Sequence, residues 1–148
     1  MNLPEKEREA VAAIAAKAKR LGGRAFLVGG AVRDSLMGLP SKDADVEVFG
    51  IAPEKLRMAL EEDFRLDLVG ASFGVFKLQR LGIDVSLPRR ESKSGEGHKA
   101  FEIEGDPALS LEDAASRRDF TINAIYFDPL DGTLHDPFGG IDDLRHRI

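Results

Sequence analysis

The order of hydrophobic and polar positions along the chain predicts helices and strands in mixed succession. From Glu5 to Leu21 apolar residues recur on one helical face, and Gly22-Gly23 follows, so residues 1–22 are predicted to hold an amphipathic helix that ends at glycine. From Ala44 to Phe49 acidic residues and valines alternate, which indicates a strand. Further helices are predicted over about 31–37, 53–62, 111–115, 120–126 and 141–148, and further strands over 24–28, 64–69, 73–78, 82–87 and 133–135.

This succession predicts an α/β (α+β) fold, with helices packed around one mixed sheet. The 148 residues suffice for one domain with a continuous core, of which the N-terminal helix is expected to be part. From 88 to 107 the chain is polar and glycine-rich without periodicity. Loops of that length are usually functional or disordered, and we expect residues 89–99 to be mobile without substrate.

Composition and charge narrow the class of protein. Hydrophobic residues make up 43% and charged residues 32%, as is usual for a globular domain. Cysteine is absent, which suits a cytoplasmic protein, and neither a signal peptide nor a run of about 20 apolar residues that would cross a membrane is found. The net charge of −5 argues against a surface that grips nucleic acid throughout. Any RNA contact is therefore expected to use a local basic patch or another part of a longer protein.

Asp43-Ala44-Asp45 is the first candidate for chemistry. In a strand, residues i and i+2 project to the same face, so the two carboxylates lie together and repel each other unless a cation or water separates them. Mg²⁺ prefers carboxylate and phosphate oxygens. The alternative is a solvated strand face without a metal.

Asp84 extends this pattern, because it alternates with apolar residues in the predicted strand 82–87. If that strand lies beside the strand holding Asp45, three carboxylates converge on one edge of the sheet. Such a group can hold two metal ions that activate an attacking hydroxyl and stabilise a leaving phosphate. The alternative is an exposed residue on a half-buried strand.

A glycine pair between a strand and a helix is the second candidate. At Gly29-Gly30 the backbone N–H groups can approach a phosphate closely. Arg33 follows in the first helical turn, where the helix dipole disfavours a cation, and a bound triphosphate would relieve that conflict. Alternatively, Arg33 and Asp34 simply pair with other charges.

The third candidate is the segment from Arg117 to Asn123. Two adjacent arginines cannot share one helix face, so Arg117 or Arg118 is free to bind a triphosphate, while Thr121 and Asn123 can hydrogen-bond a ribose. The alternative is a helix capped by Asp119 whose apolar residues enter the core.

Taken together these segments resemble a known family. The run from Leu27 to Pro40 followed by Asp43-Ala44-Asp45, and the block from Arg117 to Ala124, are similar to the two hallmarks of class II tRNA nucleotidyltransferases. This family comprises the CCA-adding enzymes and bacterial poly(A) polymerases and belongs to the DNA polymerase β-like superfamily. The segment from Asp128 to Ile148 resembles the one that closes the family's head domain.

The resemblance implies a head, or palm, domain built on a mixed five-stranded sheet, with residues 1–148 as a nucleotidyltransferase domain. It implies Asp43 and Asp45 as ligands of Mg²⁺, with two ions expected, and Asp84 at the position of the family's third carboxylate. It implies a nucleotide-binding set made of Gly29, Gly30, Arg33, Arg117, Arg118, Asp119 and Asn123.

The reaction implied is transfer of CMP or AMP from CTP or ATP to the 3′ end of tRNA or another RNA, with release of pyrophosphate and with neither membrane nor DNA involved. In this family the loop at 89–99 is associated with the switch from C to A addition. Its base-reading Glu-Asp-x-x-Arg motif lies in a neck segment after the head, so we expect base selection and most of the grip on tRNA to come from outside these 148 residues.

Two alternative functions stay open at this point. The chain is a nucleotide-binding head domain with little activity by itself, or it is a nucleotidyltransferase that acts on a non-RNA acceptor, which the shared palm fold permits.

Overall fold

Seven strands form one mixed sheet in the part of the chain that the structure, a computed structural model, describes: residues 1–71, 74–88 and 108–146. The strands are β1 (Arg24–Val28), β2 (Ala44–Phe49), β3 (Leu66–Asp67), β4 (Val75–Leu78), β5 (Ile83–Ser86), β6 (Tyr126–Phe127) and β7 (Leu134–His135). Their order across the sheet is β3-β4-β5-β2-β1-β6-β7, in which β2 and β5 pair parallel and the other pairs are antiparallel.

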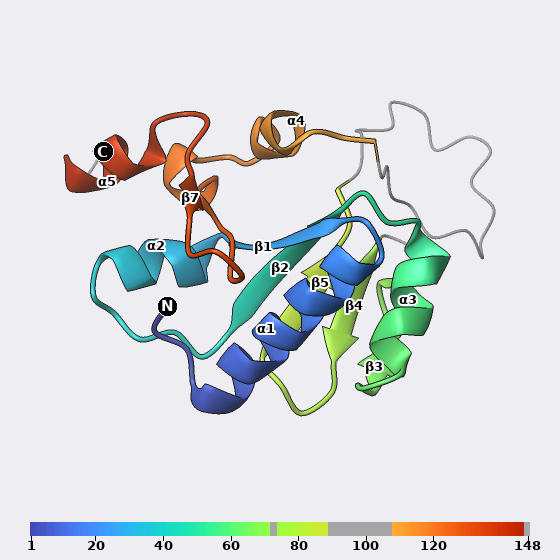
Figure 1. The fold of residues 1–148 in the computed structure, drawn as a ribbon. Coiled ribbons are helices and arrows are strands. Elements are labelled where there is room, and N and C mark those ends of the chain that lie inside the picture. The colour runs from blue at the N-terminus through green and yellow to red at the C-terminus, as the bar shows by residue number, and fades with distance from the viewer. Residues whose placement is uncertain (72–73, 89–107, 147–148) are drawn as a thin grey trace.

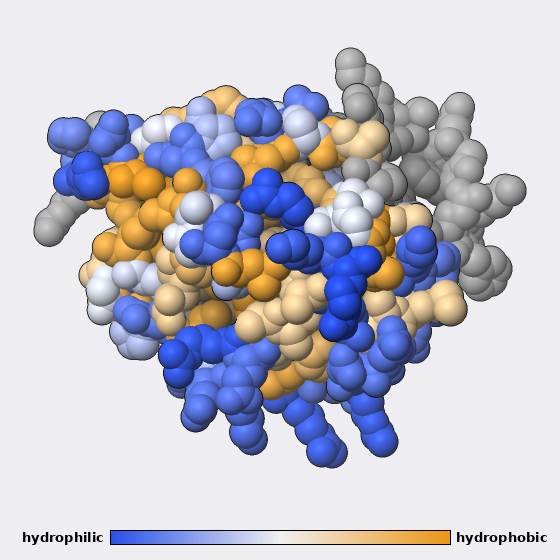
Figure 2. Space-filling view, in the orientation of Figure 1, coloured by the Kyte–Doolittle hydropathy of each residue, from blue (hydrophilic) through white to orange (hydrophobic). Residues whose placement is uncertain are grey.

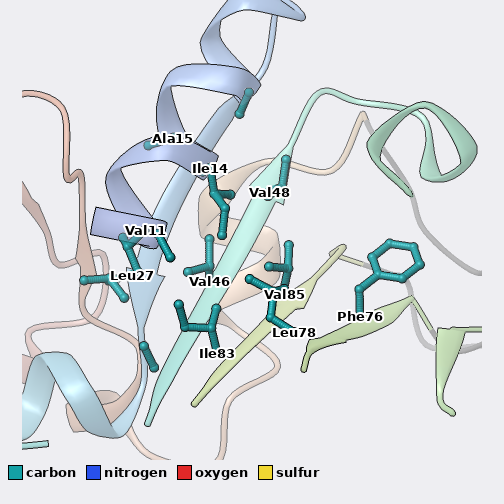
Figure 3. Packing of buried hydrophobic residues seen from close by; sticks show 14 of the residues in the cluster. Val11, Ile14, Ala15, Leu27, Val46, Val48, Phe76, Leu78, Ile83 and Val85 are labelled. Carbon is teal, nitrogen blue, oxygen red and sulfur yellow. The ribbon is translucent and has the colours of Figure 1, made fainter. Parts of the chain in front are cut away.

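Helices α1 (Glu5–Arg20) and α3 (Pro53–Glu61) pack against one face of this sheet (Figure 1). Figure 3 shows Val11 and Ile14 of α1 directed toward the valines of β2, with Ile83 and Val85 of β5 beside them. The alternation of β2 and β5 thus sends one set of side chains into the larger core. The acidic residues of both strands project from the opposite face.

That opposite face is only partly covered. A smaller cluster around Phe26, Phe49 and Tyr126 packs beneath α4 (Leu111–Ala115). The cluster is rich in aromatic rings, and Phe26 makes edge-to-face contacts with both Phe49 and Tyr126, with ring centroids 5.7 and 5.9 Å apart. Burial of these rings fixes β6 and the segment after α4 beside β1 and β2.

Two further α-helices are short. Helix α2 (Gly30–Leu36) follows β1 directly, and α5 (Gly140–Arg145) lies near the C-terminal end of the chain. Figure 2 shows hydrophobic residues gathered near α2; Leu36 at the end of this helix is exposed, as are Met37 and Leu39 just after it. No helix in the described ranges has the length and apolar character needed to cross a membrane.

The observed sheet differs from the expected five strands, because β6 and β7 extend it beyond β1. The helix predicted over 120–126 is also wrong: a single 3₁₀ turn, η2 (Thr121–Asn123), precedes β6, and Phe120 rather than Asp119 stands at its N-cap. Pairing of Phe127 with Leu27 and burial of the Tyr126 side chain outweigh the helical pattern here. The loop predicted to be mobile, 89–99, lies outside the described residues.

Candidate active site

A row of four charged residues crosses the open face of the sheet. Asp45 on β2 stands in register with Asp84 on β5, Asp84 with Lys77 on β4, and Lys77 with Asp67 on β3. The Lys77 ammonium donates to both oxygens of Asp84, at 3.1 and 3.4 Å. The predicted neighbourhood of Asp45 and Asp84 is therefore confirmed, on two central strands rather than at an edge strand.

Asp43 joins this row through a close backbone approach. A methyl group on Gly82, just before β5, would lie 2.6 Å from both Asp43 Oδ1 and the carbonyl oxygen of Lys42. The carbonyl of Gly82 also accepts a hydrogen bond of 2.7 Å from the backbone N–H of Ala44. Only glycine fits between the two segments, and its absence of a side chain lets Asp43 sit at the start of β5.

These residues line a cleft of about 540 Å³. Burial raises the pKa of Asp45, and repulsion from Asp84 and Asp43 raises it further, while Arg118 and Lys77 oppose the change. A cation would remove this repulsion. Nevertheless, no group of three or more acidic or histidine side chains in the described ranges is close enough to hold a metal ion. Lys77 engages Asp84, whereas neither Asp43 nor Asp45 forms a salt bridge among the described residues.

The raised pKa of Asp45 has a consequence for stability. We expect Asp45→Asn to increase the free energy of unfolding at pH 7, in EDTA, by about 0.2–1 kcal/mol. This is the size of the destabilisation that two like charges cause when they lie opposite each other on paired strands. A carboxyl whose pKa is higher in the folded than in the unfolded chain destabilises the fold once it ionises. The gain should therefore disappear as the pH falls through the raised pKa toward 3.8, the ordinary value. Urea unfolding of both proteins at several pH values measures it; an equal gain at every pH would contradict it.

Two guanidinium groups flank the Gly29-Gly30 pair at the start of α2. A methyl group on Gly29 would lie 3.6 Å from Arg118 Nη1 and 3.3 Å from Asp45 Oδ2, and one on Gly30 would lie 3.3 Å from Arg33 Nη2. Gly29 also has a φ of +79°, which glycine adopts without strain. The turn therefore lies between two cations and next to the acidic row.

Arg33 already has protein partners. Its Nε pairs with Asp34 Oδ1 at 3.0 Å, and its Nη1 donates to Asn123 Oδ1 at 3.1 Å. Thr121, which was predicted together with Asn123 to hydrogen-bond a ribose, donates its hydroxyl to Asp143 in this structure. Arg33 and Asp34 thus pair with each other rather than with other charges, and the oxygen of Asn123 orients Arg33. Arg33 also borders a second, largely apolar cleft of about 1020 Å³ between α2 and α5.

The two adjacent arginines are separated as expected. The Arg118 side chain is 26% exposed and extends over the sheet toward Gly29 and Glu47, whereas Arg117 is exposed, as is Asp119. The structure therefore brings together Asp43, Asp45, Asp84, Gly29 and Arg118, with Gly30, Arg33 and Asn123 adjoining them across the glycine turn. Arg117 and Asp119 make no observed contact with this group among the described residues.

Sequence reasoning missed three residues of this site. Lys77 neutralises Asp84, Gly82 admits Asp43, and Glu47 is a buried acid, 8% exposed, beside Arg118. Burial raises the pKa of Glu47, while Arg118 and the hydroxyl of Tyr126 lower it. The signal for Glu47 was present, since it shares the strand face of Asp45.

Known proteins match the chain in sequence. The model of the family described as the poly A polymerase head domain matches residues 25–148. The multifunctional CCA protein of Xylella fastidiosa strain 9a5c is 43% identical over 125 residues, which are 84% of this chain and 29% of that protein. That of Aromatoleum aromaticum is 46% identical over the same length and the same shares. The chain spans less than a third of these curated relatives.

Solved structures match it in fold. The Bacillus stearothermophilus CCA-adding enzyme in complex with CTP has a TM-score of 0.74 and 31% identity, over 97% of this chain and 33% of that one. A tRNA nucleotidyltransferase complexed with a primer tRNA and an incoming ATP analog has a TM-score of 0.65 and 34% identity, over 89% of this chain and 36% of that one. The mixed sheet and its flanking helices are therefore those of this group of enzymes.

Proposed function

The chain belongs to the poly A polymerase head domain family, and we propose that it catalyses transfer of CMP or AMP from CTP or ATP to the 3′ end of a tRNA. The observation that carries this proposal is that Asp45, in register with Asp84 of β5, meets Arg118 at the Gly29-Gly30 turn. Carboxylates beside a cradle of N–H groups and guanidiniums suit a metal-bound triphosphate.

The solved relatives support these substrates. One was crystallised with CTP and another with a primer tRNA and an incoming ATP analog. Because the chain covers only part of each relative, the activity of these relatives is a proposal for this chain. The contacts proposed below address phosphate and metal, which every metal-bound nucleoside triphosphate shares.

A divalent cation, Mg²⁺ with two ions expected, fits the donor set. Asp43 and Asp45 would hold it, since both present hard oxygen ligands and Asp45 is repelled by its acidic neighbours. When bound, the metal would lower the pKa of the attacking 3′ hydroxyl and neutralise charge on the triphosphate. Asp84 would contribute as a third carboxylate only if Lys77, which now donates to both of its oxygens, released it.

The chain's own residues would bind and orient the triphosphate. The N–H groups of Gly29 and Gly30 would donate to phosphate oxygens, while Arg118 and Arg33 would pair with their charge. Asn123 would act through Arg33, to which it is hydrogen-bonded, and Arg117 and Asp119 would act from the exposed rim. Because phosphoryl transfer needs little covalent chemistry, positioning and charge neutralisation would supply most of the acceleration.

The test is incubation of the chain with Mg²⁺, labelled CTP or ATP, and a tRNA that lacks its 3′ end. Extension by labelled nucleotide, with pyrophosphate released, is the expected result. Binding of CTP without extension would favour a nucleotide-binding head domain that needs further segments for turnover. Labelling of a non-RNA acceptor but not of tRNA would overturn the choice of substrate.

We also expect the 148-residue chain to discriminate poorly among CTP, ATP, GTP and UTP. All its proposed contacts address phosphate, metal or ribose, so affinity differences should reflect stacking alone, on the order of 1 kcal/mol or less. Calorimetric titration with the four triphosphates in Mg²⁺ measures this. A preference above about 100-fold, or roughly 2.7 kcal/mol, for CTP and ATP would show instead that these residues read the base.

A further inference from the structure

Glu47 is a buried carboxylate to which the proposed function gives no role. It lies on β2 two residues after Asp45, on the same strand face, yet it is 8% exposed. Burying a charged group costs several kcal/mol unless hydrogen bonds and an opposite charge compensate for it. The partners of Glu47 therefore indicate what the side chain does.

One carboxylate oxygen is anchored to the aromatic cluster. The hydroxyl of Tyr126 donates to Glu47 Oε1 at 2.8 Å, and the Tyr126 side chain is fully buried. Its ring packs against Phe26 and Phe49, with centroids 5.9 and 6.1 Å away. Because these rings are closely packed, the hydroxyl is a fixed donor and Glu47 has little freedom to rotate.

The other oxygen faces Arg118. Glu47 Oε2 lies 3.8 Å from Arg118 Nη2, and the guanidinium carbon lies 5.9 Å from the centroid of the Tyr126 ring. The opposite nitrogen of the same guanidinium, Nη1, points to Gly29, where a methyl group would lie 3.6 Å from it. One end of the guanidinium thus meets the Glu47–Tyr126 pair, and the other reaches the glycine turn.

We propose that Glu47, held by Tyr126, is a positioning residue that fixes the Arg118 guanidinium over Gly29 so that it meets the triphosphate already oriented. This inference rests on the proposed function. It deepens that function by naming Glu47 as the residue that holds Arg118, the main phosphate-binding cation, in place. An arginine side chain loses rotamer entropy when it is ordered, so ordering it before the ligand binds increases affinity.

The test is a double-mutant cycle on the affinity of the chain for CTP in Mg²⁺. We expect Glu47→Gln, which keeps the shape but removes the charge, to weaken CTP binding about tenfold, as is typical when the support of a ligand-binding group is lost. In an Arg118→Met background the same substitution should have no further effect, because its route to the ligand is gone. Tyr126→Phe should weaken binding in the same direction, which covers the case that Glu47→Gln does not fold.

Asp128→Asn is the matched control. Asp128, directly after β6, is also buried, at 6% exposure, and forms a salt bridge of 2.9 Å with Arg24. It should lower stability without changing CTP affinity, which separates positioning from a general structural role. Wild-type affinity in both Glu47→Gln and Tyr126→Phe, or an equal loss in the Arg118→Met background, would overturn the inference alone. Failure of the unaltered chain to bind CTP would overturn the proposed function as well.

Discussion

Replacing Asp43 or Asp45 by alanine is expected to abolish nucleotidyl transfer while the domain stays folded. Both carboxylates adjoin the Asp84 side chain in one cleft, and Asp45 is already repelled by its neighbours. Loss of a ligand from a catalytic metal site should lower the transfer rate by at least about 10³-fold. The free energy of unfolding should change by no more than about 0.5 kcal/mol or should increase, since an unfavourable charge is removed.

The measurements are single-turnover incorporation of labelled CMP into a tRNA that lacks its end, Mn²⁺ binding by electron paramagnetic resonance, and urea unfolding. Asp67→Ala is the matched control, because Asp67 lines the same cleft but lies beyond Lys77. It should retain both Mn²⁺ binding and transfer. If both Asp43→Ala and Asp45→Ala kept transfer and Mn²⁺ binding at the level of this control, the metal assignment would be wrong.

The local pattern was enough to predict most elements of this fold. The apolar period of three to four residues located α1, and alternation located β2 and β5, because burial on one face imposes these periods directly on the sequence. The same alternation put Asp45 and Asp84 on one face. Their direct register, however, depends on which strands pair, and that is a property of the whole sheet.

What could not be predicted is non-local. Glu47 has the same alternation as Asp45, but it is buried because Tyr126, 79 positions away, packs over it. Likewise Lys77 engages Asp84 only because β4 pairs with β5 in the register observed. In the segment from 120 to 126 the helical pattern was misleading, since the pairing of β6 with β1 and the burial of Tyr126 outweigh local propensity.

A second large effect, on CTP affinity, is expected when Arg118 is replaced but not when its neighbour Arg117 is replaced. Arg118→Ala should weaken binding of CTP in Mg²⁺ about 100-fold, or roughly 2.7 kcal/mol, because it removes a charge-assisted phosphate contact at Gly29. It also leaves Glu47 buried without its cation, so the free energy of unfolding should fall by about 1–3 kcal/mol.

Arg117→Ala is the matched control, since it removes the same group from the neighbouring position. The Arg117 side chain is exposed, and exposed ion pairs contribute only about 0–1 kcal/mol, so CTP affinity should fall less than about fivefold and stability should hardly change. Calorimetry with CTP and urea unfolding of the two variants decide the matter. Equal losses of affinity would mean that both guanidiniums reach the triphosphate, and a larger loss for Arg117→Ala would require the main cation to be reassigned. The asymmetry is expected because the contacts to Glu47, Tyr126 and Gly29 all belong to Arg118.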